Sequence, residues 1–419
     1  MKISIITYCY NDTAYVHELL RSMLRWTVPV DEVLVIDDGS DPPFALPLNA
    51  DGCISASGAS LPVRVHRNPQ NLGPALTKRV GLGMATGDVL VSLDCDIRVH
   101  RNFVRHALPC LAQGNVGAVG ATDIRYSGPP TLAGRWHNLR QQARERRDDC
   151  PTDFLKGGVF VIRQDVYRRI GGIDASSCDV AEDVKMSRDI RKLGLTLVEI
   201  NTYRTYQARP LSPVQACRQN IVYMGYSRLG LAAEQGAGHC ARTLAHNLMR
   251  DLALVRPDDV THAPLLIMPL LSTLSMLTFV THKLEDFPAL DATPLRGTLL
   301  HLASIMGWHA PLAALAHDTL RILRLPPSPG CSHPVGDDGT QRQTPAGSQF
   351  GTDDAMRIDI ACGACAAAMT AEQNPLTILE GVAKTLGGTI TQNASSFHYL
   401  DDKDYAYGDY IGFERLRQK

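Results

Sequence analysis

An apolar segment that ends in two carboxylates constrains the fold of this chain most strongly. The segment reads Val89-Leu-Val-Ser-Leu-Asp-Cys-Asp96, which predicts a buried strand with Asp94 and Asp96 at its carboxyl end. Ligands of open α/β sheets bind outside the carboxyl ends of strands, so these acids are expected beside a substrate. Carboxylates and phosphate oxygens are ligands that Mg²⁺ and Mn²⁺ prefer, and such a cation neutralises a departing diphosphate. A solvated turn is the alternative interpretation of an Asp-x-Asp, but the apolar strand before it favours a site.

The first 200 residues alternate short β-branched runs with longer segments of helical periodicity. This alternation is typical of a mostly parallel sheet covered by helices. Helices are expected at residues 15–25 and 75–85, and residues 42–62 are rich enough in Gly, Ser, Ala and Pro to predict an irregular surface insertion. The expected strands are residues 3–7, 32–36, 63–66, 89–93 and 116–120.

Two further apolar segments end in polar residues. The segment 33–36 is followed by Asp37, Asp38 and a glycine, and the Asp38 carboxylate could accept the imide N–H of a pyrimidine base. A structural turn is the other interpretation of this pair. The segment 3–7 continues into Tyr8-Cys-Tyr-Asn11, where the ring of Tyr8 or of Tyr10 could stack on a base.

Together these strand ends, at Tyr10, Asp38 and the pair Asp94 and Asp96, resemble the nucleotide-binding half of the family-2 glycosyltransferases of the GT-A fold. Residues 71–82 are similar to the family's Asn-x-Gly helix, and residues 85–88 to its Thr-Gly-Asp lead into the acidic strand. The resemblance implies a Rossmann-like α/β sheet with helices on both faces, a nucleotide-sugar donor, preferably a UDP-sugar, and a Mn²⁺ or Mg²⁺ cofactor bound by Asp94 and Asp96. The donor-binding residues that it implies are Thr7, Tyr8, Tyr10, Asp38, Asn71, Gly73, Lys78 and Asp94.

Two later motifs resemble the acceptor side of the same family. Residues 153–162 look like its glycine segment, with Lys156, Gly157 and Gly158, and residues 181–188 look like its Glu-Asp motif at the start of a helix. In this family the aspartate of that pair takes the proton of the acceptor hydroxyl during inversion. The resemblance therefore implies Asp183 as general base and Glu182 as the reserve candidate. The structural alternative is that both acids only complement the helix N-terminus.

The resemblance weakens after residue 200. Gln215 and Arg218 belong to a partial copy of the Gln-x-x-Arg-Trp signature of processive members, but a glutamine replaces the tryptophan, which argues against processive synthesis. Many members place a histidine just before this region as a third metal ligand. Here Tyr203, Tyr206 and Gln207 stand instead, so the third ligand is unassigned.

The rest of the chain predicts a domain organisation with four parts. Residues 1–212 form the expected catalytic domain, 213–325 a helical acceptor-side or membrane-associated region, 326–355 a flexible linker, and 356–419 a small α+β accessory module that could bind a protein partner. The uncharged residues 263–280 just reach the length that crosses a bilayer, yet two prolines and several hydroxyl residues suit a buried helix equally. A second apolar stretch at 299–315 carries two histidines and leaves the same alternatives.

Composition excludes some classes of function. A formal net charge of −1 offers no general attraction to nucleic acid. The 11 cysteines lack regular spacing, and the first residues lack the pattern of a secretory signal, so we expect reduced cysteines and a cytoplasmic protein, with the inner face of the membrane as alternative. A zinc site made from Cys331, His333, Cys362 and Cys365 is disfavoured because a linker separates its halves.

The sequence thus predicts an inverting, metal-dependent glycosyltransferase of hexosyltransferase type. Its acceptor would be a hydroxyl on a glycan, a lipid-linked molecule or a protein. A nucleotidyltransferase of similar fold is one alternative, although Tyr8-Cys-Tyr-Asn11 is not the basic glycine-rich loop that a triphosphate requires. A non-catalytic module that binds sugar nucleotides or glycans is the other alternative.

Overall fold

The computed structural model describes residues 1–46, 53–56, 59–143, 145–173, 182–220, 235–252 and 262–284, with the isolated positions 224, 228, 232 and 254. The chain divides into two compact units, each treated by itself below. Unit 1 comprises Met1–Pro129 and Arg144–Pro210, and unit 2 comprises Pro130–Ala143 and Leu211–Lys419. The expected catalytic domain, 1–212, thus differs from unit 1 chiefly because residues 130–143 group with unit 2.

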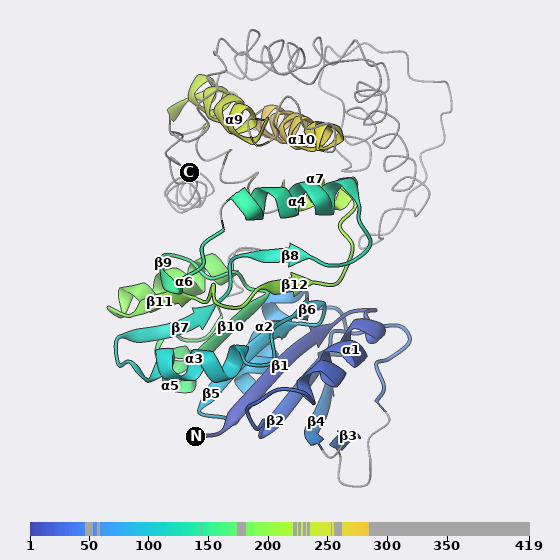
Figure 1. Ribbon diagram of the computed structural model, residues 1–419, viewed down its shortest axis with the longest axis vertical. Coiled ribbons are helices and arrows are strands. Elements are labelled where there is room, and N and C mark those ends of the chain that lie inside the picture. The colour runs from blue at the N-terminus through green and yellow to red at the C-terminus, as the bar shows by residue number, and fades with distance from the viewer. Residues whose placement is uncertain are drawn as a thin grey trace. The chain divides into compact units, whose positions relative to one another are not determined.

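Unit 1 is built on a nine-stranded mixed sheet (Figure 1) with the order β3-β4-β2-β1-β5-β10-β7-β11-β9. The neighbours from β4 to β5 run parallel, as expected, whereas β10 runs antiparallel between β5 and β7. The strands are β1 (Ile3–Cys9), β2 (Glu32–Asp37), β3 (Cys53–Ala56), β4 (Ala59–Arg67), β5 (Val89–Asp94), β7 (Val116–Gly120), β9 (Cys150–Thr152), β10 (Val159–Arg163) and β11 (Thr196–Glu199).

The predicted insertion at residues 42–62 is partly wrong. The edge strand β3 and the first residues of β4 lie within it, and these two strands pair antiparallel. Pro62 lies in β4 opposite Cys53. Residues 42–62 contain many glycines, serines and prolines and lack clear apolar alternation, so the sequence pattern did not predict these strands.

Helices cover both faces of the sheet, and alternate strand residues point to opposite faces. Ile5 packs in one core cluster with side chains of α1 (Thr13–Met23) and α3 (Phe103–Ala112). Its neighbour Ile6 packs in the other cluster with side chains of α2 (Pro74–Met84), α5 (Gln164–Arg169) and α6 (Glu182–Lys192). A Cβ at Gly81 of α2 would lie 2.5 Å from Ile6 Cγ2, so glycine permits the close approach of α2 to β1. The predicted layered α/β fold is confirmed.

A small second sheet brings distant segments of unit 1 together. Its order is β6 (Ile97–Arg98), β12 (Thr205–Gln207) and β8 (Ile124–Tyr126). β12 pairs antiparallel with β6, directly after the acidic end of β5. The chain leaving β12 is also bound there, because Ala208 N donates to Asp96 O at 2.7 Å.

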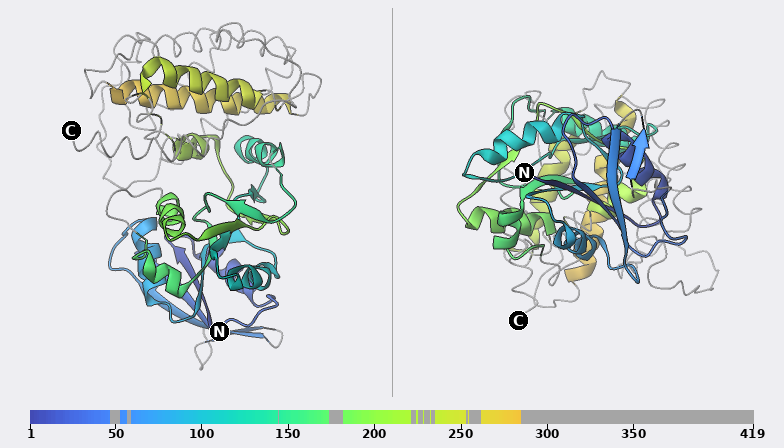
Figure 2. Two further views of the ribbon diagram at one scale, coloured as in Figure 1. Left: turned by 90° about the vertical axis from the view of Figure 1, so that its left-hand side faces the viewer. Right: turned by 90° about the horizontal axis from the view of Figure 1, so that it is seen from below.

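The described part of unit 2 is helical. It contains α4 (Leu132–Ala143), α7 (Pro213–Asn220), α9 (Ala237–Leu252), the 3₁₀ helix η2 (Ala263–Leu266) and α10 (Ile267–Leu284). Helices α9 and α10 lie side by side (Figure 2), and Arg140 of α4 forms an ion pair with Asp251 of α9 at 3.4 Å. Leu265, Leu266 and Ile267 are fully buried.

The apolar residues 263–280 therefore form η2 and most of α10. Among the residues that the structure describes, no helix is both long enough and apolar enough to cross a membrane. The apolar stretch at 299–315, the expected linker and accessory module, and the four candidate zinc ligands all lie outside the described residues.

Candidate active site

Three of the predicted strand ends meet at one edge of the sheet. In the register of the parallel strands, Tyr8 of β1 pairs with Ile36 of β2 on one side and with Asp94 of β5 on the other. The residues that follow these strands are therefore neighbours at their carboxyl ends, where α/β sheets bind ligands. Sequence patterns far apart in the chain thus converge on one location.

Asp38, at the end of β2, organises the loop that leads into α2. Its Oδ1 accepts hydrogen bonds from Asn68 Nδ2 at 2.8 Å and Leu72 N at 2.9 Å, and its Oδ2 accepts one from Gly73 N at 3.0 Å. Asn71 Oδ1 also accepts from Gly73 N at 2.9 Å. Since a carboxylate has about four acceptor positions, most of those on Asp38 are used within the chain. Contact of Asp38 with a base stays a prediction. Such a contact would use the remaining acceptor position of the carboxylate.

The residues at the end of β1 differ in their exposure. Tyr8 is buried, its hydroxyl forms a hydrogen bond with Ser92 Oγ at 2.8 Å, and burial raises the pKa of that phenol. Thr7 is also buried, with a hydroxyl that has no hydrogen-bond partner among the described residues. Tyr10 has 42% of its surface exposed. Contact of Thr7 and Tyr8 with the donor stays a prediction, and Tyr10 is the more exposed of the two tyrosines that could stack on a base.

Lys78, one turn into α2, links three segments of the site. Its Nζ lies 2.9 Å from Glu182 Oε1, 3.1 Å from Gly157 O and 3.4 Å from Asp94 Oδ1. Only 6% of its side chain is exposed. Burial opposes the charge on Lys78, but Asp94 and Glu182 raise its pKa well above the ordinary value. This ammonium therefore joins the end of β5 to the start of α6.

The pKa values of the adjacent acids Glu182 and Asp183 are shifted in opposite directions. Burial opposes ionisation of both, but Lys78 holds the pKa of Glu182 below its ordinary value. For Asp183, burial together with the charge of Glu182 raises the pKa from 3.8 to about 6, despite hydrogen bonds from Gly157 N and Val184 N. A pair of carboxyl groups with separated pKa values suits one structural ion and one group that exchanges a proton near neutral pH.

Gly157 and Gly158 shape the space between the two acidic groups. Gly157 N donates to Asp183 Oδ2 at 2.9 Å, and a Cβ at this position would lie 2.9 Å from Lys78 Nζ. Gly158 O accepts a hydrogen bond from Asp94 N at 3.0 Å. Glycine at position 157 thus allows its backbone to reach the Lys78 and Glu182 pair, which gives the predicted glycine segment a steric reason.

Asp94 and Asp96 supply two carboxylates for a cation. The side chain of Asp94 is 39% exposed and that of Asp96 is 8% exposed. Within the described ranges, no group of three or more His, Cys, Asp or Glu residues could hold a metal. Mg²⁺ usually binds through one or two carboxylates plus substrate phosphates and water. The pair therefore fits a cation that binds together with a diphosphate, rather than one enclosed by protein ligands alone.

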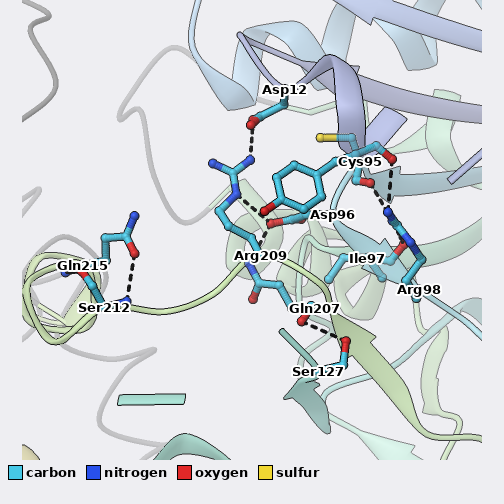
Figure 3. A network of polar contacts seen from close by, with 11 residues as sticks. Asp12, Cys95, Asp96, Ile97, Arg98, Ser127, Gln207, Arg209, Ser212 and Gln215 are labelled. Carbon is cyan, nitrogen blue, oxygen red and sulfur yellow. Dashed lines mark hydrogen bonds and ion pairs between the residues drawn. The ribbon is translucent and has the colours of Figure 1, made fainter. Parts of the chain in front are cut away.

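Two residues that contact Asp96 had no role assigned from sequence. Gln207 Nε2 donates to Asp96 Oδ2 at 2.9 Å, and Arg209 Nε donates to the same oxygen at 3.1 Å (Figure 3). Arg209 Nη2 also pairs with Asp12. Gln207 had been noted as standing where relatives carry a histidine, but nothing local in the sequence indicated Arg209, because the pairing of β12 with β6 brings it there.

Three further acceptor-side residues were predicted from the sequence. Lys156 is half-buried in the loop before β10. Gln215 belongs to unit 2, where it is exposed and its Oε1 accepts a hydrogen bond from Ser212 N at 2.9 Å at the start of α7 (Figure 3). The side chain of Arg218 lies outside the described residues. The acceptor-side roles of these three residues stay predictions.

Two family models match this sequence. The model for Glycosyl transferase family 2 matches residues 4–171. The model for Glycosyl transferase family group 2 matches residues 89–315, which is more than half of the 419 residues.

Curated relatives match over shorter segments. An uncharacterized glycosyltransferase of Haemophilus influenzae is 35% identical over 94 residues, which cover 22% of this chain and 29% of that protein. The inactive polypeptide N-acetylgalactosaminyltransferase-like protein 5 of Mus musculus is 23% identical over 182 residues, covering 38% of this chain and 42% of that protein. The chain thus spans less than half the length of these relatives.

Solved structures resemble the chain at low identity. A mannosyltransferase from Pyrobaculum calidifontis, in complex with GDP-Man and Mn²⁺, is 17% identical with a TM-score of 0.37. That match covers 76% of this chain and 84% of the mannosyltransferase.

Proposed function

The chain belongs to the family-2 glycosyltransferases, and on that premise we propose that it moves a sugar from a nucleoside-diphosphate sugar to an acceptor hydroxyl with inversion. The observation that carries the proposal is the position of Lys78. Its ammonium contacts Asp94 of the acidic pair and Glu182 beside Asp183. A donor at the acidic pair would therefore lie next to a carboxyl group whose pKa is raised toward neutrality.

The proposed reaction assigns one task to each group. Tyr10 stacks on the base of the donor, preferably a uracil. Asp94 and Asp96 would hold Mn²⁺ or Mg²⁺, which supplies charge neutralisation to the diphosphate. Asp183 takes the proton of the acceptor hydroxyl, whose oxygen bonds to the anomeric carbon while the bond to the diphosphate breaks on the opposite face. The nucleoside diphosphate leaves, and the configuration inverts.

The acceptor is a hydroxyl of a glycan, a lipid-linked molecule or a protein, and its identity depends on side chains beyond this core. Family membership does not by itself establish turnover, since one matching relative is described as inactive. A non-catalytic sugar-nucleotide module and a nucleotidyltransferase are therefore the alternatives to test.

The test measures nucleoside diphosphate release from UDP-, GDP- and dTDP-sugars, with Mn²⁺, with Mg²⁺ and with a chelator. The proposal expects one donor class to be turned over in the presence of a glycan or lipid-linked acceptor panel, with an inverted product by NMR. Donor binding without release would identify a binding module. Release of pyrophosphate from a sugar phosphate and a nucleoside triphosphate would instead identify a nucleotidyltransferase.

We expect the activity to depend on pH through Asp183. The pKa of this carboxyl is raised to about 6, so the base is ionised above that pH and protonated below it. The value of kcat/KM should be level near pH 7 to 8 and fall about tenfold per pH unit below about 6. Initial rates between pH 5 and 8, with stability checked at each pH, measure this profile. A profile that stays level down to pH 5 would contradict the assignment of the base.

A further inference from the structure

Arg209 lies at the acidic strand end with its guanidinium held on several sides. Nε donates to Asp96 Oδ2 at 3.1 Å, Nη2 pairs with Asp12, and the guanidinium carbon lies 5.3 Å from the centre of the Tyr15 ring. The charges of both carboxylates raise the pKa of Arg209 further. Two acids and an aromatic ring therefore fix the orientation of this cation (Figure 3).

Only some of the hydrogen-bond donors of the Arg209 guanidinium have a partner among the described residues. Within the part of the chain that the structure describes, its Nη1 has no hydrogen-bond partner, and 38% of its side chain is exposed. Arg98, drawn beside it in Figure 3, is different. Arg98 Nη1 donates to Cys95 O and Ile97 O, and its Nη2 to Tyr15 O and Glu18 Oε2. Arg98 thus stabilises the turn after β5, whereas Arg209 still has guanidinium N–H groups that can donate hydrogen bonds to a bound ligand.

The local charges also favour a protein cation that can reach a donor diphosphate, in addition to a metal ion on the acidic pair. Asp12, Asp94 and Asp96 give this edge an excess of negative charge, which repels an anion. Lys78 is 6% exposed and already contacts two carboxylates and a carbonyl oxygen. Of the two described cations in contact with the acidic pair, Arg209 is the more exposed.

We propose that Arg209 binds the diphosphate of the donor through its outward guanidinium donors, while Asp12 and Asp96 hold it in place. A planar guanidinium suits this task because it can give two parallel N–H groups to phosphate oxygens. The inference rests on the proposed function and adds a donor-binding residue to it. A purely structural role, in which Arg209 only ties the end of β12 to Asp96, is the alternative that the test must separate.

The test compares a nucleoside diphosphate with its nucleoside. UDP, GDP, dTDP and the matching nucleosides are titrated into the full chain by ligand-observed NMR, once with the diamagnetic cation Mg²⁺ and once with EDTA. The variants are Arg209→Gln, which removes the charge, and Arg209→Lys, which keeps the charge but lacks the planar guanidinium with its parallel N–H groups. Arg101→Gln is the matched control, because Arg101 is exposed in unit 1 and outside the site.

We expect Arg209→Gln to weaken binding of the preferred nucleoside diphosphate by about tenfold or more, with Arg209→Lys intermediate and Arg101→Gln unchanged. The loss should be larger in EDTA, where no added cation shares the diphosphate charge. Binding of the matching nucleoside should not change. Equal losses for nucleoside and diphosphate, or no loss for either, would overturn the role of Arg209. Failure of the unaltered chain to bind any of the three diphosphates, with Mg²⁺ or with EDTA, would instead overturn the proposed function.

Discussion

Replacement of Asp183 by asparagine is expected to lower kcat by about 10²–10⁴-fold, the range typical of a lost general base. Asparagine keeps the shape of the side chain, and its carbonyl oxygen can still accept the hydrogen bond that Gly157 N gives Asp183 at 2.9 Å. It cannot take a proton from the acceptor hydroxyl. The Kd for the nucleoside diphosphate should therefore change little while turnover is lost. Single-turnover rates and diphosphate titrations on the same sample measure the two effects separately.

A matched surface substitution controls for the loss of a carboxylate as such. Asp165→Asn removes an acid of α5 that is 62% exposed and pairs with Arg163, the last residue of β10. This variant should retain the full kcat. Turnover by Asp183→Asn at more than a tenth of the normal rate would contradict the assignment of Asp183 as general base. Glu182 would then be the next candidate for that role.

The raised pKa of Asp183 also predicts the effect of the substitution on stability. Its folded value of about 6 exceeds the ordinary 3.8, so the fold binds this proton more tightly than the unfolded chain does. Ionisation of Asp183 therefore costs folding free energy above about pH 6, and no cost exists below about pH 4 where both states are protonated. At pH 8 the neutral amide of the Asp183→Asn variant should leave the free energy of unfolding unchanged or higher, which urea unfolding at pH 8 measures.

Local patterns were sufficient to predict the strand ends. The runs before Tyr8, Asp37 and Asp94 are nearly continuous in apolar residues, as strands buried on both faces require, and they form β1, β2 and β5. Because parallel neighbours end at the same edge, the order of the strands was enough to bring their acids together. The edge strand β3 was missed, since a strand of four residues that includes a serine carries little of this signal.

Contacts between distant segments could not be predicted in the same way. Arg209 meets Asp12 across 197 positions of the chain, and Lys78 meets Glu182 across 104. Both contacts follow from the register of β12 on β6 and from the crossing of α2 over the sheet, which sequence periodicity does not specify. The grouping of residues 130–143 with unit 2 has the same origin, because α4 packs on helices that come much later in the chain.

Replacement of Lys78 by methionine is expected to lower the free energy of unfolding by about 3–5 kcal/mol at pH 7.5, the usual cost of breaking a buried ion pair on one side. Methionine fills a similar volume but leaves Glu182, whose side chain is 11% exposed, without its cation. Asp94 loses the same partner. Urea unfolding followed by circular dichroism measures the change. Lys192→Met is the control, because Lys192 is 66% exposed and its pair with Asp189 should contribute less than about 1 kcal/mol.

The dependence of this loss on pH distinguishes an electrostatic cause from a packing defect. In the unaltered chain, burial raises the pKa of Glu182 but Lys78 lowers it below the ordinary 4.5, so the pair stabilises the fold above about pH 4.5 and is lost as pH falls through the lowered pKa. Without Lys78, burial acts alone and raises the pKa of Glu182, so the folded variant gains a proton at acidic pH. The deficit should therefore be largest near pH 8 and narrow toward pH 5. Adding Glu182→Gln to Lys78→Met should recover part of the loss at pH 8, since no buried carboxylate then lacks a partner. A deficit that is independent of pH and unaffected by the second substitution would show that Lys78 acts through packing, and would remove the physical link between Asp94 and the catalytic acids on which the mechanism depends.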